Sequence, residues 1–268
     1  MLVRDDFSRY SWVYLLQHKS EAADAFETFL ADTRTDGSVE IVRSDNGGEF
    51  RGRFSELCVK NRIKQELTTP QCPELNGVAE RGTAVIESTR KAARLHASTR
   101  FRGTGAKLPA PTENLWDEAT NLACDAINRT ATSANVGHRS PYELWHGHTA
   151  SFQLLPFLKP GFVHKQPAQK HPAKAVPCLY LGPAHNHPRD VVRVLTDNSR
   201  NIRISRDVTW PAVPARVPPI QEGGGSHLTC PWRQIPLLVT TTTTKRRSPR
   251  LLRKANLTRA RTKRTRTT

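Results

Sequence analysis

The stretch Arg43-Ser44-Asp45-Asn46-Gly47-Gly48-Glu49-Phe50 decides the fold class of this chain. It follows residues 39–42, a short apolar and β-branched run that is typical of a buried strand. Asp45 therefore lies at the exit of a predicted strand, where its carboxylate can project beyond the edge of a sheet. Gly47 and Gly48 let the backbone turn sharply there and leave room for a ligand.

A second acidic residue, Glu80, lies in a different setting. It belongs to Asn76-Gly77-Val78-Ala79-Glu80-Arg81, where a predicted helix begins near Val78 and runs to about His96. Gly82 interrupts this helix at a cost of about 1 kcal/mol relative to alanine. A helix that starts here presents Glu80 from its first turn, so Asp45 and Glu80 can converge on one cleft. Hard carboxylate oxygens suit Mg²⁺ or Mn²⁺, and two such metals support in-line phosphoryl displacement.

Each acid also has an ordinary structural explanation. Ser-Asp-Asn-Gly by itself is more often a turn than a metal site, and a glutamate in the first turn of a helix interacts favourably with the helix dipole. Neither residue alone justifies assigning an enzyme. A metal site of this kind also uses a third carboxylate, and none is evident upstream in the sequence.

The rest of the first 150 residues predicts alternating strands and helices. Residues 10–16 are typical of a strand, and Ser20 is a candidate N-cap for a helix with an apolar stripe that includes Phe26 and Phe29. Residues 113–128 form a strongly amphipathic pattern, residues 98–111 are expected to be a connector, and residues 140–145 predict a short helix. The order favours an α/β fold.

The composition changes after Leu158. We expect residues 1–150 to form the core domain and residues 151–177, rich in Pro, His and Lys, to form a linker. Three short alternating runs predict a small β module over residues 178–212. Residues 213–268 are expected to be a disordered tail, because they are rich in Pro and Thr and then basic.

The charge is concentrated in that tail. The chain has a formal net charge of +17, and residues 245–268 hold eleven Lys or Arg and no acid, so subtracting 11 from 17 leaves +6 for residues 1–244. A basic tail of this kind favours polyanions, most often nucleic acid. Its clusters are either a nuclear-import signal or a non-specific nucleic-acid arm; they comprise Lys245, Arg246, Arg247, Lys263 and Arg264.

The cysteine and hydropathy patterns limit the cellular setting. The five cysteines are odd in number and form no Cys-x-x-Cys pair, which argues against a disulfide framework and a cysteine-rich zinc site. We expect no transmembrane helix and no signal peptide, hence no secretion, and the cysteine pattern fits a reducing compartment. The pairs His146/His148 and His185/His187 are interpreted as loop histidines, because they lack ligand partners at suitable spacing.

Several motifs together resemble the integrase of copia-type LTR retrotransposons. They follow the order of that family and cover roughly residues 4–210; they are residues 5–14, 43–50, 73–81, 115–119, 127–129, 140–145, 178–182 and 205–208. The resemblance implies a ribonuclease H-like mixed sheet flanked by helices. It also implies Mg²⁺-dependent cutting and joining of DNA by an Asp, Asp, Glu triad, in which Asp45 matches the second acid and Glu80 the third.

The same resemblance shows departures from the family. The first acid normally lies on a strand that would precede Met1, so neither Asp5 nor Asp6 is assigned to the triad, and the family's upstream His/Cys zinc module is not seen. Asp45 and Glu80 are separated by 34 residues, one fewer than is usual. Gly82-Thr83-Ala84 replaces the Asn and basic residues usual after Arg81.

Candidate DNA contacts lie around Glu80. Gln71 and Asn76 lie in the preceding loop, where the family holds a strand end. Four basic residues share or adjoin the helix of Glu80, and at a rise of 1.5 Å per residue Lys91 lies about 16 Å along its axis; these residues are Arg81, Arg90, Lys91 and Arg94. A solvated basic face explains them equally well. Such contacts would supply salt-dependent affinity and no sequence readout.

The leading hypothesis is an integrase core with 3′-end processing and strand-transfer chemistry, impaired because only two acids of the triad are present. Its expected partners are retroelement and target DNA, with a homo-oligomer as a further expectation and no membrane. The alternative is a non-catalytic nucleic-acid-binding remnant that uses its basic surface alone.

Overall fold

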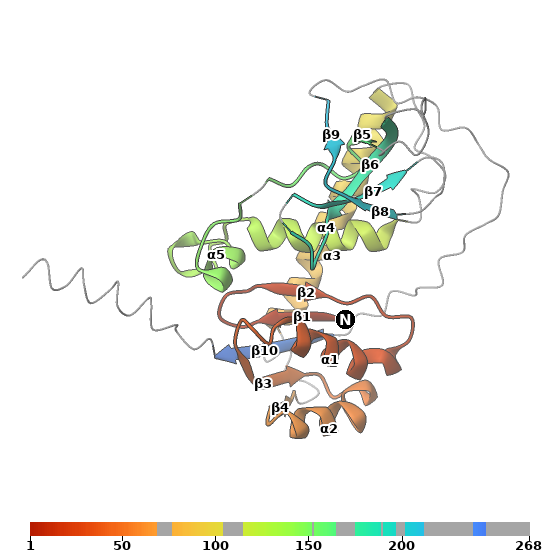
Figure 1. Cartoon of the computed structure of the whole chain (residues 1–268). Helices are drawn as coiled ribbons and strands as arrows, with labels where there is room; N and C mark the ends of the chain where they lie inside the picture. The colour runs from red at the N-terminus through yellow and green to blue at the C-terminus, as the bar shows by residue number, and fades with distance from the viewer. Residues whose placement is uncertain are drawn as a thin grey trace, which may run out of the picture.

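The computed structural model describes residues 1–68, 77–103, 115–151, 153–164, 175–188, 190–196 and 202–211, and the backbone of 238–244. Its described part contains two five-stranded sheets with helices packed against them (Figure 1). Asp45 directly follows a strand of the first sheet, Glu80 lies in a helix packed against that sheet, and the second sheet is the β module. A mixed sheet with helices on both faces agrees with the α/β class predicted from the sequence.

The first sheet has the strand order β2-β1-β10-β3-β4. Its strands are β1 (Leu2–Asp5), β2 (Ser11–Val13), β3 (Ser38–Ser44), β4 (Lys64–Leu67) and β10 (Leu238–Thr244). β1 pairs antiparallel with β2 and parallel with β10, while β3 pairs antiparallel with β10 and parallel with β4. The sheet is therefore mixed, and β10 joins its two halves.

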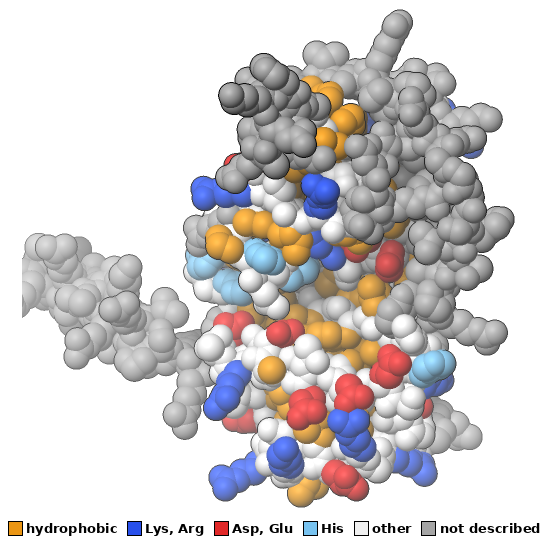
Figure 2. All heavy atoms as spheres, turned by 45° about the vertical axis from the view of Figure 1, so that its right-hand side comes forward, with side chains coloured by type: hydrophobic (Ala, Val, Ile, Leu, Met, Phe, Trp, Pro, Cys, Tyr) orange, Lys and Arg blue, Asp and Glu red, His pale blue; other side chains and the backbone are white. Residues whose placement is uncertain are grey.

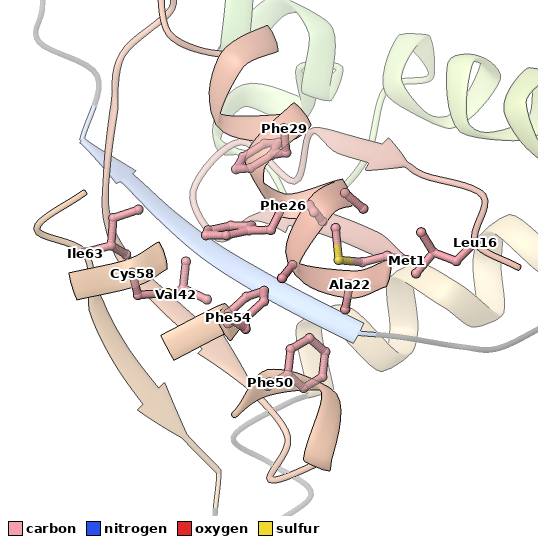
Figure 3. Close-up of a cluster of buried hydrophobic side chains, with 13 residues drawn as sticks. Met1, Leu16, Ala22, Phe26, Phe29, Val42, Phe50, Phe54, Cys58 and Ile63 are labelled. Atoms are coloured by element: carbon pink, nitrogen blue, oxygen red, sulfur yellow. The ribbon is translucent and has the colours of Figure 1, made fainter. Parts of the chain in front are cut away.

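One face of this sheet is covered by α1 (Ala22–Asp32) and α2 (Arg53–Lys60). Between them lie fully buried aromatic rings, with Phe26 and Phe54 at 4.7 Å and Phe50 and Phe54 at 5.1 Å between ring centroids. Figure 3 shows these rings from α1, α2 and the one-turn helix η2 (Gly48–Phe50) packed together beside Val42 of β3. The stripe predicted around Phe26 and Phe29 is confirmed, although the helix begins after a short 3-10 turn, η1 (Lys19–Glu21), with no side-chain cap from Ser20.

The opposite face is covered by α3 (Gly77–Gly103) and α4 (Trp116–Arg129). The alternation along β1 explains the two faces, because Val3 packs with the aromatic cluster while Leu2 packs with Ile86 of α3 and Ala123 of α4. The predicted connector at residues 98–111 is corrected in its first part, since α3 continues to Gly103.

A buried asparagine fastens α4 to the sheet edge. Asn128 Nδ2 donates to the carbonyl of Ser11 at 2.8 Å, and the N–H of Ser11 donates back to Asn128 Oδ1 at 2.9 Å. The pair satisfies backbone groups of β2 that no outer strand reaches among the described residues. It thereby fixes the end of α4 beside the sheet.

The short helix α5 (Pro141–His146) closes the core domain. Ser140 and Glu143 form a capping box, with the Glu143 N–H donating to Ser140 Oγ at 3.2 Å and the Ser140 N–H donating to Glu143 Oε2 at 2.8 Å. Trp145 packs edge-on against Trp12 at 4.8 Å and donates through Nε1 to Asp36 at 3.0 Å. The predicted terminal helix is thus confirmed and tied to β2. The 3-10 turn η5 (Val136–His138) precedes it.

The second sheet has the strand order β8-β7-β6-β5-β9. Its strands are β5 (Pro160–His164), β6 (Ala175–Pro183), β7 (Val192–Thr196), β8 (Ile202–Ser205) and β9 (Val208–Thr209). The three predicted runs are present as β6, β7 and β8. The structure differs from the expected division in two places: β5 lies inside the expected linker of residues 151–177, and β10 lies inside the expected disordered tail of residues 213–268.

The β module packs on the helices of the core. Leu181 of β6 and Leu195 of β7 share a buried cluster with Phe101 of α3 and Leu122 of α4. Beside this cluster, Arg193 and Glu118 form an ion pair, with 2.8 Å between Arg193 Nη2 and Glu118 Oε2. These two atoms are not aligned for a hydrogen bond, but Arg193 Nη1 donates a hydrogen bond to Glu118 Oε1 at 3.5 Å. Both side chains are largely buried, and burial raises the pKa of Glu118 while Arg193 lowers it.

Replacing Asn128 tests the fastening of α4. Asn128→Ala leaves the Ser11 N–H without its partner, and we expect a loss of about 1–3 kcal/mol in the free energy of unfolding measured by urea denaturation. Asn61→Ala is the matched control, because Asn61 Nδ2 donates to Leu57 O at 2.8 Å at an exposed helix end. It should cost about 0.5 kcal/mol or less. Equal losses in the two variants would contradict the role of Asn128.

Replacing Arg193 tests the ion pair and gives a pH dependence. Arg193→Met leaves the Glu118 carboxylate buried without its cation, and we expect a loss of about 3–5 kcal/mol near pH 7. A carboxyl group whose pKa is higher in the folded protein favours folding below its ordinary value of 4.5, and this contribution is lost as the pH rises through the folded pKa. The variant should therefore recover part of its stability near about pH 4. Arg203→Met, at an exposed position of β8, should show neither effect.

Candidate active site

Asp45 is positioned by the end of β3. Its Oδ1 accepts a hydrogen bond from the Gly47 N–H at 3.2 Å, so the carboxylate caps the turn that leads into η2. The side chain is half-buried. This contact agrees with the turn interpretation of Ser-Asp-Asn-Gly, and among the described residues Oδ2 makes no hydrogen bond or ion pair. Asp45 can therefore serve the turn and still offer an oxygen to a ligand.

Glu80 is exposed in the first turn of α3. A negative charge at this position also interacts favourably with the positive end of the helix dipole. The chain reaches this helix from the same end of the sheet that carries Asp45, because the Thr68 N–H donates to Ser44 O at 2.9 Å directly after β4. Eight residues, 69–76, then lead to Gly77 and lie outside the described residues.

The register of the sheet relates the two acids in space. Leu2 is paired with Leu238, and Val239 is paired with Ser44, so Leu2, Leu238 and Asp45 lie at one level of three adjacent strands. Two strand spacings separate Leu2 from Asp45 by about 10 Å. A Cβ at Gly82, two residues after Glu80, would lie 3.3 Å from Leu2 Cδ2. The structure thus brings Asp45 and the first turn of α3 to the same end of the sheet.

Gly82 has a steric reason for being glycine. A Cβ at this position would lie 2.5 Å from Nη1 and 3.0 Å from Cδ of Arg4, which extends from β1 onto α3. Among the described residues, Nε and Nη1 of Arg4 are buried and have no hydrogen-bond partner, and burial lowers the pKa of this guanidinium. The predicted interruption at Gly82 is absent, since α3 continues through this residue, and glycine there leaves room for the Arg4 side chain between α3 and β1.

The candidate site contains two carboxylates, those of Asp45 and Glu80. Over the residues that the structure describes, no cluster of three or more His, Cys, Asp or Glu side chains is arranged to hold a metal ion. β10, the strand between β1 and β3, has the sequence Leu-Val-Thr-Thr-Thr-Thr-Thr and contributes no acid. The two acids fit a hard divalent cation by donor type, but they fall short of a closed set of ligands.

The residues predicted to contact DNA differ in how exposed they are in the structure. Arg81 and Lys91 are exposed on α3, and Arg94 is half-buried, so a role as phosphate contacts remains a prediction for these three. Arg90 is only 7% exposed, which departs from the expected surface contact. Gln71, Asn76 and the tail cations lie outside the described residues; the tail cations are Lys245, Arg246, Arg247, Lys263 and Arg264.

The charged surface does not by itself define a nucleic-acid interface. Figure 2 shows acidic and basic side chains interspersed over the first sheet and its helices α1 and α2 on this face.

The buried thiols are poor nucleophiles and metal ligands near neutral pH, because burial raises the pKa of Cys58 to about 11 and that of Cys178 to about 12. His185 lies 3.4 Å from Asp125, while His148 and His187 are exposed. In the described part, no helix is suited by length and hydropathy to cross a membrane.

Comparison with known sequences gives the class of this chain. No family model matches. The chain is 35% identical over 185 residues to the retrovirus-related Pol polyprotein from transposon TNT 1-94 of Nicotiana tabacum, covering 66% of the chain and 13% of that protein. It is 30% and 28% identical over 188 residues to the corresponding polyproteins from transposons RE1 and RE2 of Arabidopsis thaliana, covering 12% of each.

The chain is thus a homologue of the Pol polyproteins of copia-type retrotransposons, and it spans about an eighth of the length of these relatives. The motifs predict that the matched part of these polyproteins is an integrase core.

Solved structures resemble the chain more distantly. The HTLV-2 integrase catalytic core domain in complex with magnesium has 20% identity and a TM-score of 0.39, covering 53% of this chain and 81% of its own. The BIV integrase catalytic core has 20% identity and a TM-score of 0.35, covering 51% and 76%. A simian T-cell lymphotropic virus intasome in complex with a PP2A regulatory subunit has 15% identity and a TM-score of 0.40, covering 79% and 72%. Because these identities and TM-scores are low, the class of the chain is assigned from the sequence relatives alone.

A double-mutant cycle tests the contact between Gly82 and Arg4. A buried clash of this size should make Gly82→Ala destabilising by about 1–3 kcal/mol, although alanine favours a helix. In an Arg4→Ala background the clash is gone, and the same substitution should stabilise the protein by about 1 kcal/mol. Urea denaturation of the four proteins measures the coupling. The same change in both backgrounds would show that Arg4 does not set the choice of glycine.

Proposed function

We propose that this chain is the integrase-core segment of a copia-type Pol polyprotein and acts in DNA integration through metal-dependent 3′-end processing and strand transfer. The observation that carries the proposal is the position of Asp45 after β3 and of Glu80 in the first turn of α3, at one end of the sheet. The homology to Pol polyproteins over 185 residues supports it. The proposed partners are retroelement and target DNA, with self-association as a further proposal.

The chemistry requires two displacements at phosphorus. In 3′-end processing, water attacks a phosphodiester near the end of a strand, so that the shortened strand keeps a 3′ hydroxyl and the released fragment carries the phosphate. In strand transfer, that hydroxyl attacks a target phosphodiester, so one P–O bond forms as another breaks. Asp45 and Glu80 are the side chains that would hold Mg²⁺ or Mn²⁺, which when bound lowers the pKa of the attacking hydroxyl and stabilises the leaving oxygen.

The number of side chains that can bind the metal ion determines the rate of strand transfer that we expect. Among the described residues no group of three acidic side chains is arranged to hold a metal ion. Two carboxylates hold a divalent cation weakly, so we propose that the activity is impaired relative to a site with a complete triad. The turn hydrogen bond from Gly47 to Asp45 orients one carboxylate oxygen. The exposure of Glu80 leaves its carboxylate accessible to a ligand. A nuclear or particle location follows from this function and is proposed with it.

A second candidate function is a non-catalytic nucleic-acid-binding remnant. It is favoured by the lack of a three-ligand group among the described residues and by the excess of positive charge at residues 245–268. In this case DNA affinity would come from phosphate contacts that are sensitive to salt.

Substitution of the two acids separates these functions. We expect measurable strand transfer with Mn²⁺ and oligonucleotide ends, and a loss of at least about tenfold in Asp45→Asn and in Glu80→Gln, because each removes one of two metal ligands. Glu87→Gln, a half-buried position further along α3, is the matched control and should retain the activity. Transfer that survives both substitutions would contradict the assigned site.

DNA binding is measured on the same proteins. If wild type shows no transfer while both acid variants bind DNA as wild type does, the remnant is the better description. Arg81→Ala and Lys91→Ala should each reduce the slope of log affinity against log salt by about 1 if these residues contact phosphates. Lys60→Ala, an exposed residue at the end of α2, should leave the slope unchanged.

A further inference from the structure

Gly47 orients the Asp45 carboxylate, because its N–H donates a hydrogen bond to Asp45 Oδ1 at 3.2 Å. The φ of −59° and ψ of 147° at Gly47 are open to any L-amino acid, so the backbone conformation does not require glycine. A Cβ at this position would, however, lie 2.7 Å from Oε2 and 2.8 Å from Cδ of Glu49. The Glu49 carboxylate therefore folds back over Gly47, and this contact leaves no room for a side chain.

Glu49 is held by a cation from another part of the chain. Lys19 Nζ lies 3.6 Å from Glu49 Oε1, and the two residues belong to η1 and η2, which lie against each other. The Glu49 side chain is only 10% exposed, whereas the Lys19 side chain is 58% exposed. A carboxylate with so little access to water depends on a nearby cation. Removal of the Lys19 charge should therefore release Glu49 from Gly47 toward solvent.

The turn after Asp45 is fixed at its two ends and flexible between them. Ser44 of β3 and Phe50 of η2 are both fully buried, and the Phe50 ring lies in the aromatic cluster (Figure 3). The Phe50 N–H donates to Gly47 O at 3.1 Å, which fixes the carbonyl side of Gly47. Positions 47 and 48 are both glycine, the residue with the most conformational freedom. The orientation of the Gly47 N–H therefore depends on its contacts with Asp45 and Glu49.

We propose that Glu49, held by Lys19, is a positioning residue for the candidate site. Its carboxylate lies over Gly47 and keeps the Gly47 N–H on Asp45 Oδ1, which fixes the orientation of the Asp45 carboxylate. Glu49 acts through Gly47 and does not bind the metal itself. The effect on the Gly47 N–H stands by itself, whereas the effect on metal binding rests on the proposed function.

The exchange of the Gly47 amide proton with water, measured by NMR on the full chain without metal or DNA, tests the positioning directly. Lys19→Met and Glu49→Ala should each speed this exchange at least about fivefold, which corresponds to the loss of one hydrogen bond. The double variant should exchange no faster than either single variant, because both substitutions act through one contact. Lys64→Met is the matched control, since it removes an ion pair of 2.9 Å with Glu66 at the end of β4 remote from Asp45.

The sign of the change separates positioning from a direct effect of charge. Amide exchange near neutral pH is catalysed by hydroxide, so a direct charge effect would slow it in Lys19→Met and speed it in Glu49→Ala. Loss of the contact over Gly47 speeds it in both variants. Unchanged exchange in both variants, changes of opposite sign, or an equal change in Lys64→Met would overturn the proposal.

Strand transfer with Mn²⁺ measures the consequence at the candidate site. In Lys19→Met, the Mn²⁺ concentration for half-maximal transfer should rise at least about fivefold, because a carboxylate that is not held in place binds a cation less tightly. Lys19→Arg keeps the positive charge and should remain within about twofold of wild type. An unchanged Mn²⁺ requirement in Lys19→Met would overturn the role at the site. If wild type transfers no strand, the proposed function fails, and the exchange of the Gly47 amide still decides whether Lys19 and Glu49 position it.

Discussion

The pairing of backbone groups across the middle of the first sheet is the constraint on which the rest of this structure depends. The inner edges of β1 and β3 need a partner, and β10 meets both. This pairing sets the distance between β1 and β3, and hence the distance between the strand that supports α3 and the strand that ends at Asp45. The arrangement of the candidate acids is therefore a consequence of a strand that contains no acid.

The two faces of the sheet use different physical means to hold their helices. Aromatic packing around Phe54 secures α1 and α2, whereas α3 and α4 are secured by smaller side chains and by specific polar contacts. Arg4 fills the space above Gly82, and Asn128 pairs with the backbone of Ser11. Polar contacts of this kind lose more when one partner is removed than they contribute when both are present.

The β module is part of the same packed structure as α3 and α4. Apolar residues of α3, α4, β6 and β7 share one cluster, and the Glu118–Arg193 ion pair lies beside it. α3 begins at Gly77, three residues before Glu80, and contributes Phe101 near its other end to this cluster, so one helix connects the candidate site to the module.

The sequence by itself determined the class of the chain and the identity of its candidate acids. Local chemistry was sufficient there: an apolar run before Asp45, a helix start before Glu80 and the Ser140 capping box each depend on neighbouring residues only. The termination of α3 was misjudged, since buried Phe101 extends the helix beyond the expected connector. The purpose of Gly82 required the structure, because Arg4 is distant in sequence. The placement of residues 238–244 was decided by tertiary structure alone, because the demand for a strand arises from unpaired edges that only the folded sheet creates.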